Sequence, residues 1–187
     1  MPTPELAAVV LAGGTGARLD GADKSGIELH GRTLLQHALD AVAEAGQVVV
    51  VGDPVPPGTQ ATFVREEPAY GGPAAALLTG LGALSPGPSV VAVLAVDMPR
   101  VTAQTLRRLR LAMAGHDGAA LVDDQGRRQL ALAISLDRLR AVAPTPEAWP
   151  GLPLRTLLAS LDLVAVAAVG DEGRDVDTWA DLRDLRG

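Results

Sequence analysis

Three short stretches of this sequence are apolar at every position, and they restrict the chain to a small group of folds. They are Leu6–Leu11, Val48–Val51 and Val90–Val96. A strand with one face in water alternates polar and apolar residues, whereas a strand covered on both faces is apolar throughout. The three stretches therefore predict buried strands of a mostly parallel sheet that is covered by helices.

Helical patterns lie between these predicted strands. In Thr33–Gln36 the threonine can cap a helix and the glutamine can bond back to it, and the apolar stripe that follows ends at Gly46. Gly72-Pro73 starts a second helix, and Thr102 caps a third. Strands that alternate with helices predict a three-layer α/β/α sandwich. Residues 1–187 contain no internal repeat and no domain-size linker, so we expect one domain.

The remaining predicted elements are shorter. We expect strands at Thr62–Arg65, Ala119–Val122, Leu130–Ile134 and Leu163–Ala167, and helices at Leu154–Ser160 and Thr178–Leu185. An acidic loop, Asp171–Asp177, precedes the last helix. The proline-rich segment Ala143–Pro153 is predicted to be extended, as a flap or as a contact with a partner subunit.

Composition excludes several kinds of site. The 187 residues include no cysteine, which removes disulfides, thiolate metal sites and a cysteine nucleophile. His30, His37 and His116 lack the spacing of zinc ligands. The net charge of −6 disfavours nucleic acid as a partner but allows small anionic substrates where cations cluster. We recognise no signal peptide and no apolar run of the roughly 18–20 residues that span a bilayer, so we expect a cytoplasmic protein without a membrane partner.

The first apolar stretch runs into a glycine-rich loop that carries two cations. Gly13, Gly14 and Gly16 are followed by Arg18 and Lys24. The loop lacks the Gly-Lys pair of a Walker motif and the third glycine of a dinucleotide fingerprint, which disfavours a dehydrogenase. Glycine N–H groups can approach phosphates closely, and the cations can neutralise them. The loop therefore predicts a nucleoside triphosphate site, and the alternative is a glycine turn with two surface cations.

Asp97 directly follows the third apolar stretch. In an open parallel sheet, ligands bind at the carboxyl ends of the strands, so we expect Asp97 on the same edge as the glycine loop. A carboxylate there can hold Mg²⁺ while substrate phosphates supply further ligands. The alternative is a turn or helix-capping residue.

Taken in order, these motifs resemble those of the molybdenum cofactor guanylyltransferases, the MobA-like nucleotidyltransferases. The matching segments span nearly the whole chain and are Leu11–Leu19, Asp23-Lys24, Glu28–His37, Gly71–Leu77, Asp97-Met98-Pro99, Gln129–Ala133 and Asp175–Leu182. The resemblance implies a Rossmann-like sheet of the nucleotidyltransferase (GT-A-like) type. It also implies Mg²⁺-dependent transfer of GMP from GTP to the phosphate of molybdopterin, with release of pyrophosphate.

The resemblance assigns roles to individual residues. Arg18, Lys24 and Asp97 are assigned to catalysis, the two cations on phosphate oxygens and Asp97 on Mg²⁺. The residues assigned to nucleotide binding, in part through backbone groups, are Leu11, Ala12, Gly13, Gly14, Lys24, Gly52, Glu66, Gly72, Pro73 and Asp97. Glu66 follows a predicted strand directly, and Glu67 is the alternative register. His37 lies within a predicted helix, and we expect a structural role for it.

The closing motif departs from the family pattern. Asp175 and Asp177 stand where the family has two asparagines, and Trp179 replaces a proline. An extra carboxylate at position 177 either helps to hold Mg²⁺ or weakens nucleotide binding. This altered motif keeps open a non-catalytic nucleotide-binding paralogue. Because base choice depends on a few pocket contacts, two sister activities also stay open: a CTP-dependent transferase acting on the same cofactor and a sugar-phosphate nucleotidyltransferase. Proteins that deliver or accept the cofactor are further expected partners.

Overall fold

The computed structural model describes residues 5–13, 23–54, 59–67, 69 and 71–186. Its strands are β1 Leu6–Leu11, β2 Glu28–Leu29, β3 Arg32–Thr33, β4 Gln47–Val51, β5 Thr62–Val64, β6 Val90–Ala95, β7 Gly118–Val122, β8 Arg128–Ser135 and β9 Leu163–Ala167. Its helices are α1 Leu34–Ala41, α2 Pro73–Gly82, α3 Ala103–Ala112, α4 Leu136–Val142, α5 Leu154–Leu157 and α6 Trp179–Arg186. Short 3-10 turns are η2 Lys24–Gly26, η3 Pro146–Ala148 and η4 Gly170–Gly173. Within the described residues, no helix has the length and apolar character needed to cross a membrane.

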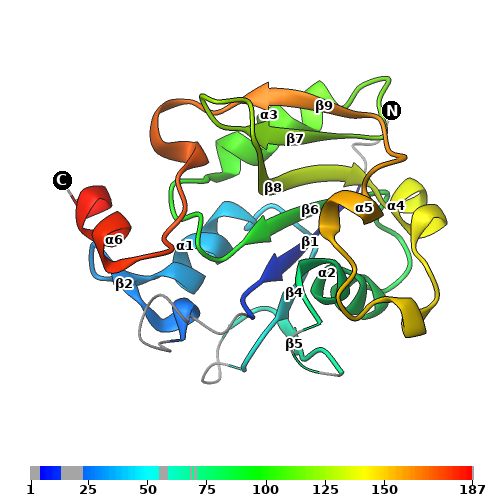
Figure 1. Ribbon diagram of the computed structural model, residues 1–187, viewed down its shortest axis with the longest axis horizontal. Helices are drawn as coiled ribbons and strands as arrows, with labels where there is room; N and C mark the ends of the chain where they lie inside the picture. The colour runs from blue at the N-terminus through cyan, green and yellow to red at the C-terminus, as the bar shows by residue number, and fades with distance from the viewer. Residues whose placement is uncertain (1–4, 14–22, 55–58, 68, 70, 187) are drawn as a thin grey trace.

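The main sheet has seven strands in the order β5-β4-β1-β6-β8-β7-β9 (Figure 1). The pairs β1–β4, β1–β6, β4–β5 and β7–β9 are parallel. Strand β8 is antiparallel to both β6 and β7. The predicted mostly parallel sheet is thus confirmed, and the hairpin β7–β8 accounts for its antiparallel pairs.

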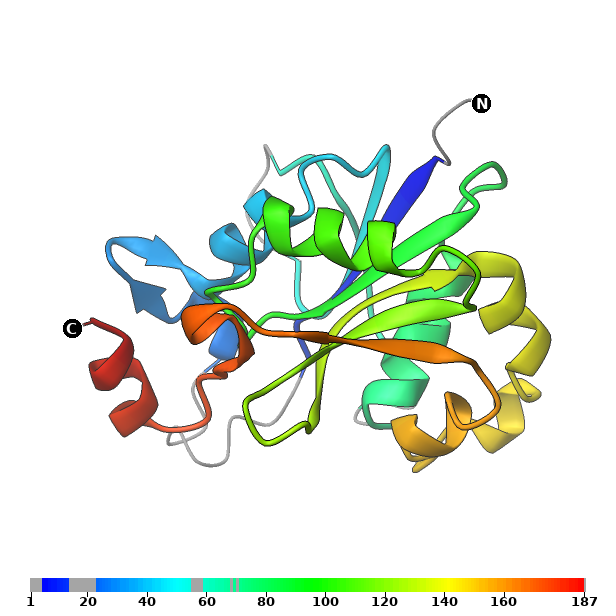
Figure 2. The ribbon, with the colours of Figure 1, turned by 90° about the horizontal axis from the view of Figure 1, so that it is seen from above.

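Different helices cover the two faces of the sheet. Along β1, Ala8 and Val10 face the cluster that contains residues of α1, α3 and α6, whereas Ala7, Val9 and Leu11 face the cluster of α2, α4 and α5. Figure 2 shows α3, in green, on one side of the sheet and the yellow and orange helices α4 and α5 on the other. The predicted α/β/α layering is therefore confirmed.

The predicted start of α1 is confirmed by a capping box. Thr33 Oγ1 accepts a hydrogen bond from the Gln36 N–H at 3.1 Å, and Gln36 Oε1 accepts one from the Thr33 N–H at 2.9 Å. Thr102 caps α3 in the same way with Thr105 as its partner. These reciprocal bonds satisfy N–H groups that the first turn of a helix leaves unpaired.

A glycine allows α2 to pack closely against the sheet. A Cβ atom at Gly80 would lie 2.5 Å from Val9 Cγ1 and 3.0 Å from Val51 Cγ2, well inside van der Waals contact. Glycine weakens an isolated helix, yet here α2 continues through Gly82 because the close approach buries its apolar face. The same residue that lowers helix propensity therefore permits the packing.

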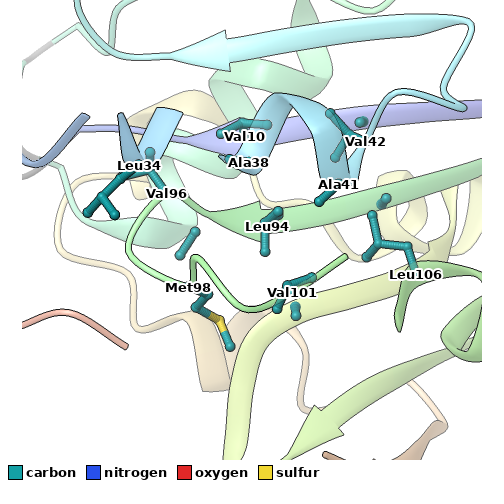
Figure 3. Packing of buried hydrophobic residues seen from close by; sticks show 14 of the residues in the cluster. Val10, Leu34, Ala38, Ala41, Val42, Leu94, Val96, Met98, Val101 and Leu106 are labelled. Atoms are coloured by element: carbon teal, nitrogen blue, oxygen red, sulfur yellow. The ribbon is translucent and has the colours of Figure 1, made fainter. Parts of the chain in front are cut away.

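The segment after β6 is anchored in the core on both sides of Asp97. Val96 and Met98 are each 3% exposed, as is Val101. Figure 3 shows Met98 and Val101 in the apolar layer formed with α1 and β6. Burial of both neighbours determines where the Asp97 side chain leaves the sheet.

Several predicted boundaries differ from the structure by a few residues. Helix α1 ends at Ala41, and Gly46 instead donates its N–H to Leu6 O at 2.9 Å. The helix predicted at Leu154–Ser160 ends at Leu157. The ribbon β2–β3 is short, and its turn, His30-Gly31, has φ angles of 52° and 75°. Such two-residue strands leave too little pattern for a prediction from sequence.

Candidate active site

Three loops leave one edge of the sheet together because β1, β4 and β6 end there in register. Leu11 pairs with Val51 on one flank and with Ala95 on the other. Gly52 follows Val51 directly, and Asp97 lies two residues beyond Ala95. The residues directly after β1 (Ala12 and Gly13), Gly52 and Asp97 therefore leave the sheet side by side, as the order of parallel strands predicts.

On one flank, Lys24 lies between two carboxylates from distant parts of the chain. Its Nζ atom is 3.0 Å from Asp97 Oδ2 and 2.7 Å from Asp177 Oδ1. The side chains of Lys24 and Asp97 are 18% and 22% exposed, so this contact is largely shielded from water. We call Lys24, Asp97, Asp175 and Asp177 the charged side of the site.

Backbone contacts hold the two acidic segments together. The Val176 N–H donates to Asp97 O at 2.8 Å, and the Val176 side chain is fully buried. Asp181, in the first turn of α6, accepts at Oδ2 from the N–H groups of Asp177 at 3.1 Å and Thr178 at 2.7 Å. The position of Asp177 is therefore set by the fold before any ligand binds.

A capping contact also positions Lys24. Asp23 precedes the η2 turn, and its Oδ1 accepts from the Ser25 N–H at 3.0 Å and from Ser25 Oγ at 2.8 Å. Aspartate commonly caps such turns in this way. In the Asp-Lys pair of the sequence motif, Asp23 therefore stabilises the turn, and Lys24 contacts the two carboxylates.

The charged side has an excess of negative charge. Burial on its own would lower the pKa of Lys24, but the bonds and charges of Asp177 and Asp97 outweigh burial and raise that pKa above its usual value. Desolvation, together with the charges of Asp177 and Asp97, raises the pKa of Asp175. Three carboxylates facing one lysine form an environment that a divalent cation would neutralise.

Asp97 and Asp177 are the described side chains that fit a metal ion. An oxygen of each contacts the same ammonium group, so both can point at one cation. Carboxylate oxygens are the ligands that Mg²⁺ prefers. Within the described residues, however, no three His, Cys, Asp or Glu side chains are close enough together to hold a metal by themselves. A metal here would need further oxygens from a bound ligand.

On the other flank of β1, Glu66 lies beside Gly13. Its Oε2 accepts from the Gly71 N–H at 2.8 Å, and its Oε1 would lie 3.7 Å from a Cβ atom at Gly13. Oε1 has no hydrogen-bond partner within the described residues. Burial raises the pKa of Glu66, although the Gly71 bond opposes this. The carboxyl group is thus held at one oxygen and presents the other beside Gly13.

Two glycines, Gly13 and Gly71, lie beside this carboxyl group, and two more, Gly52 and Gly72, lie next to them. A Cβ atom at Gly52 would lie 3.0 Å from Ala12 Cβ, so a side chain there would displace Ala12. Gly72 has a φ of 94° and begins α2 without a side-chain cap, and Pro73 follows in the first turn. Such a surface lets a flat ligand approach the main chain closely. We call this set of residues the glycine side; its members are Gly13, Gly52, Glu66, Gly71 and Gly72.

The structure brings most of the predicted site residues to one sheet edge. Leu11 and Ala12 bury their side chains, at 6% and 8% exposure, so only their backbone is near the edge. Gly14 and Arg18 lie outside the described residues. The structure also gives Glu66, rather than Glu67, the bond to the α2 loop.

Two residues outside the predicted site are clarified by the structure. His37 places Nε2 3.0 Å from Leu29 O, which agrees with the structural role expected for it. Asp177 joins Asp97 and Lys24, although the sequence left its effect open between helping and hindering. In the sequence, the only sign of this role was the extra acid in the closing motif. The fold shows that this motif lies beside Asp97.

Comparison with known proteins identifies a family and a shared fold. The family model described as the MobA-like NTP transferase domain matches residues 8–166. A molybdenum cofactor guanylyltransferase of Burkholderia ambifaria (strain MC40-6) is 31% identical over 191 residues, covering 95% of this chain and 82% of that protein. The crystal structure of Rv0371c from Mycobacterium tuberculosis H37Rv aligns with a TM-score of 0.73 and 25% identity, over 99% of this chain and 98% of that one. Molybdopterin-guanine dinucleotide biosynthesis protein A from Archaeoglobus fulgidus has the same fold, with a TM-score of 0.72 and 22% identity over 96% of each chain.

Proposed function

Since the chain belongs to the MobA-like NTP transferase family, and is therefore a nucleotidyltransferase, we propose that it transfers GMP from GTP to the phosphate of molybdopterin. Its relatives that are named molybdenum cofactor guanylyltransferases support these substrates. The observation that carries the proposal is the position of Lys24 between Asp97 and Asp177, at the same sheet edge as the glycine side. One flank suits a triphosphate with its metal, and the other suits a base.

The proposed reaction joins two anions. An oxygen of the molybdopterin phosphate attacks the α-phosphorus of GTP in line, and a new P–O bond forms. The bond to the bridging oxygen of the β-phosphate breaks, and pyrophosphate leaves with that electron pair. No covalent intermediate on the protein is needed, so positioning and charge neutralisation account for most of the rate.

The charged side performs this neutralisation in our proposal. Asp97 and Asp177 would hold Mg²⁺, which when bound would neutralise charge on the phosphate oxygens. Lys24 leaves the two carboxylates and binds phosphate oxygens, as Arg18 does from the glycine loop, and N–H groups near Gly14 approach the triphosphate. Once these groups are in place on the bound substrates, their charges stabilise the transition state without further reorganisation.

The glycine side binds the nucleoside in our proposal. The Oε1 atom of Glu66, which has no partner among the described residues, accepts hydrogen bonds from the N1–H and 2-amino groups of guanine. Backbone groups of Leu11, Ala12 and Gly13 line the base, and the bare backbone at Gly52 and the Gly72-Pro73 turn lie against the nucleoside. Cytosine lacks that adjacent pair of donors, so a carboxylate at this position favours GTP over CTP.

The test is product formation by the purified protein with molybdopterin and Mg²⁺. GTP, CTP and ATP are compared in parallel, and pyrophosphate and the dinucleotide are both measured. We expect product with GTP at a rate at least tenfold above that with CTP. Product with CTP alone would support nucleotidyl transfer but would show that the protein uses CTP instead of GTP. Tight GTP binding without product from any triphosphate would overturn the proposal in favour of a non-catalytic nucleotide-binding protein.

A further inference from the structure

The proline-rich segment Ala143–Pro153, between α4 and α5, is fastened to the glycine side. We call it the strap. Trp149 Nε1–H donates to Pro144 O at 3.0 Å, which closes the strap on itself. Trp149 and Leu152 pack against the apolar cluster on the α2 face of the sheet. In Figure 1 the strap, in yellow to orange, lies on the same side of the sheet as α2. It is therefore a packed part of the fold.

The strap meets the glycine side at Gly71. The Gly151 N–H donates to Gly71 O at 2.9 Å. A Cβ atom at Gly71 would lie 3.7 Å from Pro150 Cα, 3.3 Å from Glu66 Oε2 and 2.7 Å from Ala75 Cβ. Gly71 is thus enclosed between the strap, the Glu66 carboxyl group and α2, with no room for a side chain.

Two hydrogen bonds in series connect the strap to Glu66. Gly151 N–H binds Gly71 O, and Gly71 N–H in turn binds Glu66 Oε2 at 2.8 Å. Because both bonds use the main chain of Gly71, a shift of the strap would shift this residue and release or tilt the carboxyl group. The orientation of Oε1 beside Gly13 therefore depends on the strap.

We propose that the strap is a specificity-determining element that positions the Glu66 carboxyl group toward the base of the nucleotide. This inference rests on the proposed function in one respect, since it assumes that the ligand is a guanine nucleotide. It assigns the strap to base selection and leaves the chemical step to the charged side. Gly151 is a positioning residue, since it acts through Gly71 and Glu66.

The chain offers a matched pair of variants. Gly151 and Gly115 have φ angles of 75° and 84°, and a Cβ atom at either would meet nothing within 4 Å. Alanine is disfavoured to a similar degree at both positions because an L side chain rarely adopts this conformation. Gly115 lies between α3 and β7, and β7 runs in the same direction as β6, so Gly115 lies at the sheet edge opposite the site. Only Gly151→Ala strains the strap.

The experiment measures binding of GTP and of ITP, which lacks the 2-amino group, to the full-length protein by calorimetry. The wild type should bind GTP about tenfold more tightly than ITP, the discrimination expected from one hydrogen bond to a carboxylate. Gly151→Ala should reduce this ratio to about threefold or less, while Gly115→Ala keeps it. Both variants should show a similar small fall in melting temperature. Glu66→Gln is the reference variant, since it shows the ratio of GTP to ITP affinity of a protein without the carboxylate.

The outcomes separate the two proposals. A wild-type ratio that Gly151→Ala leaves unchanged, while Glu66→Gln reduces it, would overturn the role of the strap. Equal losses in Gly151→Ala and Gly115→Ala would show a general effect of strain and would overturn it too. A wild type that binds GTP and ITP equally would overturn base recognition by Glu66 and with it the strap. Failure of the proposed function would appear separately, as absence of dinucleotide product despite selective binding.

Discussion

The charged side and the glycine side lie on the same sheet edge, but different contacts hold them. Lys24, Asp97 and Asp177 are joined by ion pairs of 3.0 and 2.7 Å between segments far apart in sequence. On the glycine side, Glu66 and Gly71 are held through main-chain N–H and C=O groups. One flank therefore depends on charge, and the other on backbone position.

This difference predicts different results from mutation on the two flanks. Charges that act on a transition state change turnover when they are removed. Backbone groups that read a ligand change affinity and selectivity, and leave the chemical step alone. Variants of the charged side should therefore reduce turnover without changing base discrimination, and variants of the glycine side should do the opposite.

The largest effect is expected for Asp97→Asn. We predict that turnover falls about 100-fold to 1,000-fold, the range seen when one preorganised charge-stabilising group is lost. The ratio of GTP to ITP affinity should stay at the wild-type value because Glu66 is untouched. Steady-state kinetics and calorimetry of the same preparation measure both quantities.

Asp124→Asn is the matched control for this variant. Asp124 is an exposed acid in the β7–β8 turn, at the same sheet edge, and its substitution changes the charge equally. It should keep turnover within about twofold of the wild type, as expected for a surface change away from the site. Asp97→Asn turnover close to that of the control would remove Asp97 from the metal site.

A smaller effect is expected on metal binding from Lys24→Met. In the structure the Lys24 ammonium contacts both carboxylates that would hold the cation. A metal ion must therefore displace it or bind beside a like charge. Without nucleotide, Lys24→Met should bind Mn²⁺ about tenfold more tightly than the wild type, a modest share of one charge–charge interaction near a surface.

Electron paramagnetic resonance of free Mn²⁺ measures this affinity. Arg138→Met serves as the control because Arg138 is an exposed cation that pairs with Asp117 instead. Affinity for Mn²⁺ should increase only in Lys24→Met. An equal increase in both variants would indicate a general charge effect, and no increase in either would place the metal away from Asp97 and Asp177.

The two flanks also differ in how far the sequence predicts them. Asp97 could be placed because it directly follows an apolar stretch, and strand order brings its loop beside the glycine loop. Asp177 could not, because its position depends on the Val176 N–H bond to Asp97 O. The contact of Gly151 with Gly71 could not be predicted either, because it is also a main-chain hydrogen bond between segments far apart in sequence. Local patterns determine which elements form, whereas packing determines which loops meet.

The smallest effect concerns how the loop leading to Asp177 is held. Glu172 is in the η4 turn just before this loop, and its side chain is 12% exposed. It accepts from both terminal nitrogens of Arg108 at 2.9 Å, and from Val169 N–H at 2.8 Å. Burial alone would raise the pKa of Glu172, but these bonds outweigh burial and lower it below its usual value. The charged side is thus supported by a carboxylate that must stay ionised.

We therefore predict an acid-dependent loss of stability that Glu172→Gln removes. A carboxyl group with a lowered pKa in the folded state stabilises the fold above its unfolded-state pKa of about 4.5, and this stabilisation is lost as the pH falls below that value. At pH 7, Glu172→Gln should lower the free energy of unfolding by about 1–2 kcal/mol, because Arg108 loses its charged partner. The difference from wild type should shrink steadily below about pH 4.5.

Urea denaturation at several pH values tests this prediction, and Glu44→Gln is the control. Glu44 also pairs with an arginine, Arg107, but at an exposed position distant from the site edge. Its loss should destabilise the protein less, since exposed ion pairs contribute little. If Glu172→Gln were no more destabilising than Glu44→Gln, the loop before Asp177 would be held by its backbone, as the glycine side is. The two flanks would then differ only in the groups that contact the ligand, because main-chain contacts would hold the surrounding loops on both flanks.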